Sequence, residues 1–467
     1  MKTKDIKIYF YFFSILVVLI FLYICRPSGL YFLADDFVHI PLSISSVFYD
    51  STWLRPVSRI SLWLNGSINQ INYTSFYITN LLLHFLNSIL IFFLALKMQK
   101  RYIYNIRSYY FFPLLSSLLF LSYASHTESI FWIVGRGGSL VTVFIQLSLI
   151  FNFSDKLVNK LFSYLFFAIA LFTYELSWSL PLLISFFALC DKYFLQQRIR
   201  KYEVLFYWII LLVYFFVRYF LLKGELNHYE AGAFIHGDFL SISYNFFTAL
   251  ARVFVPGFQN PLVFCFVTLL TFLVLICLIL KIYKKQKKSF VFFFICFTGI
   301  CISIIPILSK GANTHNSEAE RFIYPATIFW CFIIAYLVSF IKNIFFKHMV
   351  FIALIITQLF FFNLSSEDYR YGSYVTKYLI NEINRLPPSD TLNFENLPSA
   401  YSGAIIFRSG FPSSAKGILN KEFKKVNVIS YKELFKKEHF KTVIIDIHST
   451  PSNALISLKA DTFFIYK

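Results

Sequence analysis

The sequence predicts an all-α polytopic membrane protein with about eleven transmembrane helices, followed by a small domain outside the membrane. Of its 467 residues 58% are hydrophobic and only 14% are charged, and 61 are Phe, far more than the core of a soluble domain uses. Apolar runs long enough to cross the hydrocarbon recur up to about residue 364. Crossing about 30 Å of hydrocarbon takes about 20 apolar residues in a helix, so the runs predict spans.

The spans follow from the apolar runs taken in order. We expect them at 8–25, 77–96, 109–124, 138–153, 160–174, 177–194, 203–222, 262–280, 289–308, 323–341 and 349–364. The first run is followed by "CRPSGLYFLADD" instead of a small-residue cleavage site, which predicts a retained span and not a signal peptide. The seven Cys lie in or beside apolar runs without a CxxC pattern, which favours apolar packing over disulfides or metal binding.

The net charge of +19 is explained by membrane topology. With the N-terminus inside, the inner loops hold about 20 Lys and Arg against about 8 in the outer loops, which is the positive-inside pattern. No nucleic-acid partner is therefore needed to explain the charge. The acidic residues before residue 365 fall mostly in the outer loops, which indicates either solvated loops or a shared site on the outer face.

The chain divides near residue 365. Residues 1–364 form the predicted membrane module, and residues 365–467 the predicted extracytoplasmic domain, which an odd number of spans places outside. The stretch 365–390 is typical of a helix stopped by a Pro pair, and "NVISY", "KTVIIDIH" and "DTFFIYK" are typical of short strands. We expect a small α/β or α+β domain.

The first outer loop carries two adjacent carboxylates and then an amphipathic segment. "LADDFVHI" places Asp35 and Asp36 a few residues beyond the first span. In "RPVSRISLWLNGSINQI", apolar residues recur at helical spacing and Pro56 suits a first turn. The apolar stripe consists of Val57, Ile60, Leu64, Ile68 and Ile71. This pattern predicts a helix that lies in the membrane interface, or equally a loop helix packed on protein.

The second span contains a polar stripe inside the apolar run. Asn80, His84 and Asn87 in "FYITNLLLHFLNS" share one helical face. Polar groups at this depth are costly unless they face the bundle interior or water. The stripe therefore predicts hydrogen bonds between helices, or alternatively the wall of a cavity.

Three later outer loops bring further charges to the same side of the membrane. "HTESIFWIVGRGGSL", "TYELSW" and "KGANTHNSEAERFIYP" contribute His126, Glu128, Arg136, Glu175, Lys310 and Arg321. Each charge alone suits a solvated loop end. Their convergence on one side predicts a site there.

Five motifs in order resemble the GT-C glycosyltransferases, membrane enzymes that use polyprenyl-phosphate sugars. These motifs are "ADDF", "LRPVSRISLWLN", "FYITNLLLHFLNS", "HTESIFWIVGRGGSLVTVF" and "TYELSWSLPLL", with "ERFIYP" as a weaker echo. The protein O-mannosyltransferase branch and its tetratricopeptide-bearing relatives are the most similar, over about residues 8–195. Two features differ from that pattern: the tail has no tetratricopeptide repeat, and Tyr174 stands where relatives tend to have Lys.

The resemblance implies a GT-C fold and an inverting transfer with Asp35 or Asp36 as catalytic base. The leaving phosphate would be bound by Arg136 and Arg321 first, then by Arg55, Arg59 and Lys310. Orientation of the acceptor, or of a divalent cation if one is required, would fall to His126, Glu128, Glu175 and His84. The partners would be a polyprenyl-phosphate sugar and a protein, glycan or lipid acceptor. We expect the inner (plasma) membrane of a bacterium, with the site facing the periplasm or exterior.

Two other functions fit a protein of this composition. A non-enzymatic polyprenyl-lipid flippase or transporter would be expected to carry inverted repeats and polar groups at the midplane, and the sequence has no matching halves. An O-antigen-type ligase or polymerase would rely on Arg and His of large outer loops without an acid pair in the first loop. No Walker loop, GxGxxG after a strand, HExxH or GxSxG motif occurs.

Overall fold

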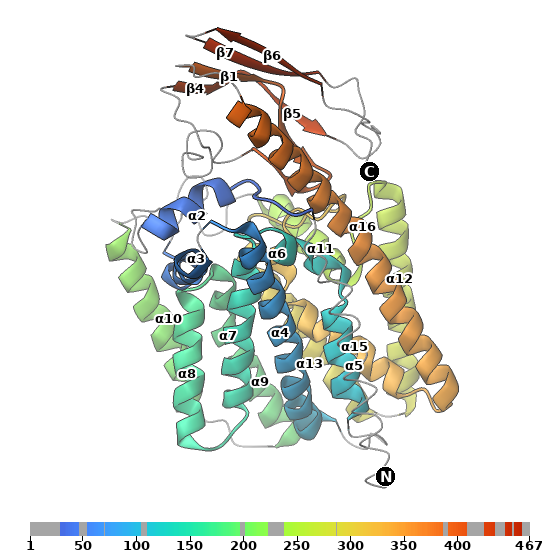
Figure 1. Ribbon diagram of the computed structural model, residues 1–467. Helices are drawn as coiled ribbons and strands as arrows, with labels where there is room; N and C mark the ends of the chain where they lie inside the picture. Colours follow the sequence, from blue (N-terminus) through green and yellow to red (C-terminus); the bar gives the residue numbers. More distant parts are fainter. Residues whose placement is uncertain are drawn as a thin grey trace.

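A computed structural model shows a bundle of long helices with β-strands gathered at one end, hereafter the sheet end (Figure 1). The structure describes residues 29–45, 54–69, 71–103, 110–196, 201–222, 238–285, 287–385, 391–408, 425–434, 444–450 and 453–459. The predicted first span, 8–25, lies outside these residues.

Each of the other ten predicted spans coincides with a helix of the described chain. These helices are α4 (Tyr73–Tyr102), α5 (Phe111–Leu121), α7 (Arg136–Asn152), α8 (Leu157–Leu171), α9 (Leu180–Leu195), α10 (Lys201–Leu221), α12 (Pro261–Lys285), α13 (Lys287–Ile304), α15 (Thr327–Ser339) and α16 (Ile344–Arg385). Within the described residues, six helices are long and apolar enough to cross a membrane. A bent pair, Ala124–Phe131 with Arg136–Asn152, makes a seventh if it counts as one span. The chain is therefore an integral multi-pass membrane protein.

The predicted number of about eleven spans is not confirmed, because several apolar helices of the described chain are short. Helices α5, α8 and α15 have 11, 15 and 13 residues, fewer than the roughly 20 that a full crossing takes. The structure also contains an unpredicted helix, α11 (Phe239–Phe254), whose cap Asp238 accepts a hydrogen bond from the Ser241 N–H at 2.8 Å.

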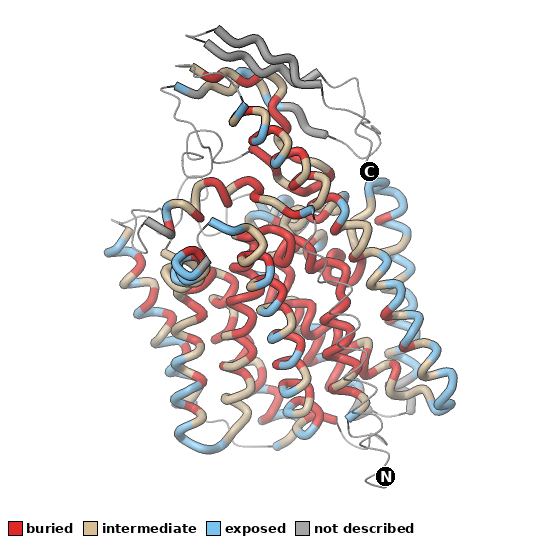
Figure 2. The backbone as a smooth tube through the Cα atoms, viewed as in Figure 1, coloured by how far each residue is buried: buried red, intermediate tan, exposed pale blue. Residues whose placement is uncertain are grey.

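Burial separates the centre of the bundle from its lipid-facing flanks. Figure 2 shows buried residues concentrated in the central helices, whereas α10 and α12 carry long exposed stretches. Leu212 on α10 and Leu269 on α12 are 70% and 71% exposed. Exposed apolar side chains on membrane-length helices are the expected contact surface for lipid tails.

The amphipathic segment of the first loop forms α3 (Pro56–Asn69), beginning at the expected Pro. Its polar side contacts the protein, since Ser58 Oγ donates to the Thr173 carbonyl at 2.8 Å and Asn65 Nδ2 donates to Thr79 Oγ1 at 2.8 Å. Its apolar stripe points outward, with Ile68 75% exposed. This orientation favours the interfacial helix over a helix whose apolar face packs on protein.

The polar stripe of α4 forms hydrogen bonds between helices and chain segments. All three side chains are buried. Asn80 Nδ2 donates to the Trp132 carbonyl at 3.0 Å, and Asn87 Nδ2 donates to the Ser139 carbonyl at 2.8 Å. The two ring nitrogens of His84 lie 2.7 Å from Tyr324 Oη and 3.0 Å from the Leu121 carbonyl.

The sheet domain begins after a helix that leaves the membrane without a break. Helix α16 runs for 42 residues through the predicted boundary at 364/365, so the two units share one helix. The strands are β1 (Thr391–Glu395), β2 (Leu397–Tyr401), β3 (Ala404–Ile405), β4 (Lys425–Val428), β5 (Tyr431–Leu434), β6 (Ile444–Thr450) and β7 (Asn453–Lys459). They form two sheets, in the orders β4-β1-β7-β6 and β3-β2-β5.

The first sheet is mixed: β1 pairs in parallel with β4 and β7, and β6 is antiparallel to β7. Predicted strands at "NVISY" and "KTVIIDIH" overlap β4 and β6, while "DTFFIYK" lies outside the described residues. The sequence analysis missed β1, β2, β3 and β7.

Candidate active site

The first loop lies between the membrane helices and the sheet domain. On the domain side, the Ala34 N–H donates to the Ile406 carbonyl at 2.7 Å, and the rings of Phe37 and Phe407 stack with centroids 5.9 Å apart. On the bundle side, Trp132 Nε1 donates to the Leu33 carbonyl at 3.2 Å. Contacts from both sides therefore fix the position of the acid pair at residues 35 and 36.

Asp36, at the start of α2 (Asp36–Ser45), is fully buried and holds the loop together. Its Oδ2 accepts from the Leu33 N–H at 2.9 Å, and its Oδ1 accepts from the Val134 N–H at 3.0 Å. Burial raises the pKa of Asp36 to about 8, although these two N–H groups act in the opposite direction. Both oxygens are thus engaged, and Ala34 beside them adopts a left-handed backbone with φ 46°.

Asp35 is partly exposed and shares a helical face with His39. The Asp35 carbonyl accepts from the His39 N–H at 2.9 Å, which begins the helix. Burial lowers the pKa of His39 below its usual range; the charge of Asp35 opposes this, and Arg55 and Arg59 reinforce it. The charges of one carboxylate and two guanidinium groups therefore all influence the pKa of the His39 imidazole.

Arg55, which directly precedes α3, is held by Glu175 and Tyr174. Arg55 Nε donates to Glu175 Oε2 at 2.8 Å, and its guanidinium carbon lies 4.1 Å from the centroid of the Tyr174 ring. Arg218 approaches Glu175 Oε1 at 3.4 Å from the other side. The aromatic residue at position 174 thus provides a face for the Arg. Glu175 is a partly buried partner of two cations and not a fully exposed loop tip.

Arg136 is enclosed by neutral acceptors. The side chain is 1% exposed, and NH1 donates to Asn65 Oδ1 at 2.6 Å while NH2 donates to the Phe76 carbonyl at 3.0 Å. These bonds join α7 to α3 and α4. The structure therefore places this expected phosphate ligand in a helix-linking position.

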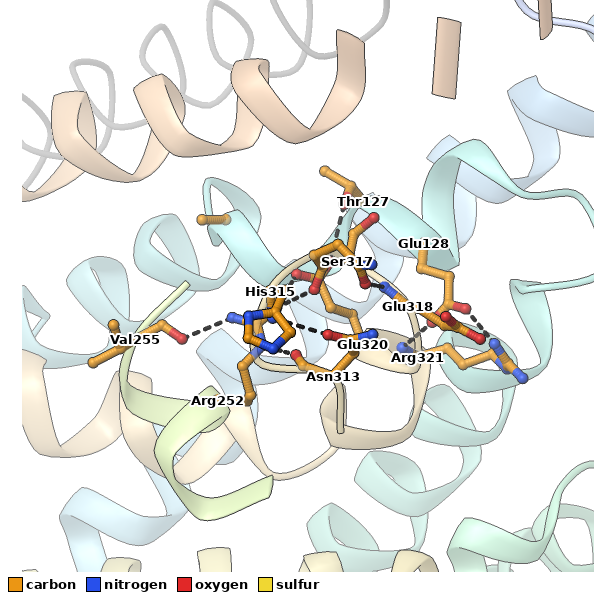
Figure 3. Close-up of polar contacts among 12 residues, drawn as sticks. Thr127, Glu128, Arg252, Val255, Asn313, His315, Ser317, Glu318, Glu320 and Arg321 are labelled. Atoms are coloured by element: carbon orange, nitrogen blue, oxygen red, sulfur yellow. Dashed lines mark hydrogen bonds and ion pairs between the residues drawn. The ribbon is translucent and has the colours of Figure 1, made fainter. Parts of the chain in front are cut away.

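Two further Arg–Glu pairs lie in the segment that precedes α15, as Figure 3 shows. Arg321 pairs with Glu128, and the Arg321 N–H also donates to Glu128 Oε2 at 2.7 Å. Arg252 of α11 pairs with Glu320, whose other oxygen accepts from Thr127 Oγ1 at 3.0 Å. Burial raises the pKa of Glu320 to about 7 despite the charge of Arg252.

His126 and His84, which the resemblance assigns to orienting the acceptor or a cation, form one buried aromatic group with Tyr324. Their ring centroids are 5.3 Å apart, and His126 Nε2 lies 2.9 Å from Thr327 Oγ1. In the part of the chain that the structure describes, no three His, Cys, Asp or Glu side chains are arranged to hold a metal ion.

Three adjacent pockets open among these residues at the sheet end. The Arg55 pocket, of about 40 Å³, is lined by Arg55, Tyr174, Glu175, Lys310 and Phe322 among others. The Arg408 pocket, of about 460 Å³, shares Lys310 and Phe322 with it and adds Arg321 and Arg408. The Asp368 pocket, of about 720 Å³, shares Asn313 and His315 with the Arg408 pocket. The pockets therefore form a continuous series.

Several members of this site were not anticipated. His39 had a signal, because it stands four residues after Asp35 in "DDFVH". Arg218 and Arg252 lie on helices α10 and α11, and Arg408 lies in the sheet domain. Their carboxylate partners are 43, 68 and 90 residues away along the chain, a separation at which sequence spacing gives no signal.

The fold and this site define an integral membrane protein with a charged site at one end of its helices. No protein-family model and no curated protein matches the chain. Among solved structures the chain is similar to ArnT from Cupriavidus metallidurans bound to undecaprenyl phosphate, with a TM-score of 0.47 and 9% sequence identity over 90% of each chain. A likeness this distant assigns no role to any residue.

Proposed function

We propose that the protein is a GT-C-type glycosyltransferase that moves a sugar from a polyprenyl-phosphate carrier to an acceptor hydroxyl on the outer face of the membrane. The observation that carries this proposal is Asp35, a partly exposed carboxylate at the sheet end, four residues before His39, on which Arg55 and Arg59 also act. The order of motifs in the first 195 residues supports it independently.

Asp35 acts as the base in this proposal. Its carboxylate takes the proton of the acceptor hydroxyl while that oxygen bonds to the anomeric carbon of the sugar. The bond between this carbon and the phosphate oxygen breaks through an oxocarbenium-like state, and polyprenyl phosphate leaves with the electron pair. Attack on the face opposite the phosphate inverts the anomeric centre.

Asp36 positions Asp35. Both oxygens of Asp36 accept backbone N–H groups and its side chain is fully buried, so it cannot meet an acceptor without breaking those bonds. Of the two neighbouring acids, partial exposure therefore favours Asp35 as the group that touches substrate.

The leaving phosphate is bound by cations that line the pockets. Arg55 and Lys310 line the Arg55 pocket, and Arg321 lines the next one. Arg59 belongs to the same group of cations, because its charge helps to lower the pKa of His39. Arg136 is enclosed and holds α3 in place instead of binding the phosphate. Glu175 orients Arg55, and Glu128 orients Arg321. Cations held in this way stabilise developing negative charge without reorganising.

The acceptor remains a protein, glycan or lipid hydroxyl, and the membrane a bacterial inner membrane with the sheet domain on the periplasmic or exterior side. The position of the tail after the last span and the Lys and Arg of the opposite loops support this orientation.

The test is sugar transfer by the purified protein, in liposomes that contain a labelled polyprenyl-phosphate sugar. Asp35→Asn should lose transfer by about 10²- to 10⁴-fold, the usual contribution of a general base. Glu367→Gln, at an exposed acid of α16, should behave like the unmodified protein. Wild-type rates in Asp35→Asn, Asp36→Asn and the double variant would refute the catalytic assignment.

A further inference from the structure

The Arg408 pocket lies where the membrane module and the sheet domain meet. It is bounded by α11, by the segment from Lys310 to Phe322, and by Ile405 and Arg408 of the sheet domain. Two glycines make this junction tight. A Cβ on Gly311 would lie 2.6 Å from Asn245 Oδ1, and one on Gly403, which has a φ of +100°, would lie 2.8 Å from the Asn316 side chain. The Gly403 contact is therefore a close approach of the sheet domain to the segment that borders the pocket, and the Gly311 contact packs that segment against α11.

The lining of this pocket is positively charged. Lys310, Arg321 and Arg408 contribute three cations, and Glu318 is the acid among its lining residues. Arg408 is 50% exposed and Arg321 is 18% exposed, so a ligand can reach both side chains. Guanidinium forks recognise planar or tetrahedral oxyanions, and a Lys adds a point charge.

The acids near this pocket hold the arginines in place. Glu318 pairs with Arg408, and Glu128 pairs with Arg321, whose guanidinium carbon also lies 4.3 Å from the centroid of the Phe322 ring. An Arg has five N–H donors, and Arg408 pairs with Glu318 through one nitrogen, so its side chain keeps donors for an oxyanion. Orientation before binding lowers the entropy cost of association.

Neutral polar groups complete the lining. Tyr244, Asn245 and Thr248 of α11 line the side of the pocket next to Lys310, and Asn245 Nδ2 donates to the Leu308 carbonyl at 2.8 Å. Hydroxyl and amide groups beside cations suit a ligand that carries both an anion and hydroxyls. A volume of about 460 Å³ lies within the range of sites for small molecules.

We propose that Arg408, and not Lys310 or Arg321, which bind the leaving phosphate, holds the anionic group, phosphate or carboxylate, of an acidic acceptor sugar in the Arg408 pocket. Arg408 thereby makes the sheet domain a determinant of acceptor specificity. This inference rests on the proposed transferase function. The pocket adjoins the Arg55 pocket through Lys310 and Phe322, so an acceptor anchored there lies next to Arg55, one of the cations that act on His39.

Equilibrium binding to the purified full chain in detergent tests this inference without requiring transfer. The soluble probes are galacturonate, which carries a carboxylate, and galactose, its neutral counterpart. The membrane probe is geranyl phosphate, which represents the carrier. Wild type should bind galacturonate at least about tenfold more tightly than galactose, as a charge-assisted hydrogen bond provides.

Arg408→Met should remove the preference for galacturonate over galactose and leave the binding of geranyl phosphate unchanged. Arg408→Lys should keep part of the preference for galacturonate. Arg385→Met is the matched control, because Arg385 forms an exposed pair with Glu382 on α16. Equal binding of the two sugars by wild type, or an unchanged preference in Arg408→Met, would overturn the inference. Loss of geranyl phosphate instead of galacturonate would assign the pocket to the carrier and would also overturn it.

The two proposals fail separately. If galacturonate binds as expected but no sugar is transferred, the transferase function is wrong and the anion site stands. If sugar is transferred but galacturonate binds no more tightly than galactose, the transferase function stands and the proposal of an acidic acceptor is wrong.

Discussion

The polar residues within α4 and those at the sheet end differ in charge. The described partners of Asn80, His84 and Asn87 are neutral: backbone carbonyls, the Tyr324 hydroxyl and the Gln146 amide. At the sheet end, by contrast, Arg55–Glu175, Arg252–Glu320 and Arg321–Glu128 are ion pairs, and they lie in or beside pockets. The first arrangement joins helices, and the second holds charged groups ready for a ligand.

This difference favours the proposed transferase over a transporter. A transporter places its substrate groups near the midplane, between halves of its helix bundle. In the described part of α4, the polar stripe is instead used in bonds between helices. The charges collect where a lipid phosphate at headgroup level and a water-soluble acceptor can meet.

The largest expected effect comes from breaking a buried ion pair at the sheet end. Arg252→Met leaves Glu320 buried without its cation, and unpairing of this kind costs about 3–5 kcal/mol of folding free energy. The melting temperature in detergent should fall steeply and should recover in part when Glu320→Leu is added. A melting temperature equal to wild type in the single variant would show that the pair is not structural.

The next effect is on catalysis. Lys310→Met removes a cation that lines two pockets and should lower the rate constant for sugar transfer by about 10²- to 10³-fold, as loss of one charge-stabilising donor does. Lys342→Met is the control at an exposed Lys between α15 and α16, and it should leave the rate unchanged. Equal transfer rates in the two variants would show that Lys310 is not part of the phosphate site.

A pH effect should follow from the burial of Asp36. Its pKa is raised from about 4 in the unfolded chain to about 8 in the fold, so between these values the folded state holds a proton that the unfolded state has released. Stability from this group therefore falls as pH rises, by at most about 1.4 kcal/mol per pH unit. Melting temperatures measured at pH 6, 7 and 8 should decline more steeply in wild type than in Asp36→Asn, and parallel declines would contradict the shifted pKa.

The smallest effect is expected within the bundle. Asn87→Ala removes hydrogen bonds to the Ser139 and Leu83 carbonyls and should cost about 1 kcal/mol of stability, the usual value for an interhelical bond in a membrane. Its transfer rate should stay within about threefold of wild type, because the residue touches no pocket in the described structure. A loss of transfer rate as large as that expected for Lys310→Met would indicate that the active site lies within the bundle.

The sequence predicted the parts of the fold that depend on local pattern. Apolar runs gave the positions of ten described helices, and Pro56 with its periodic stripe gave α3, because helical period and hydrophobicity are local properties. The number of full crossings was not confirmed, since an apolar run does not reveal that α5 ends after 11 residues. Most strands of the sheet domain were missed, because their pairing joins segments far apart in the chain.

The candidate site was predicted by residue type but not by contact. Asp35, Arg55, Lys310 and Arg321 were singled out as outer-loop charges, and the structure brings them to neighbouring positions at the sheet end. Nothing local showed that Arg136 would be enclosed by α3 and α4, because Asn65 and Phe76 lie 71 and 60 residues away along the chain. Tertiary contacts therefore separated the cations that line pockets from the cation that links helices.

The most direct measurement is a structure of the protein with a bound, non-reacting polyprenyl-phosphate sugar analogue. The account predicts the phosphate against Arg55 and Lys310, with the anomeric carbon facing Asp35. A phosphate found beside His84 within the bundle, or one that leaves Asp35 without contact to the sugar, would contradict it.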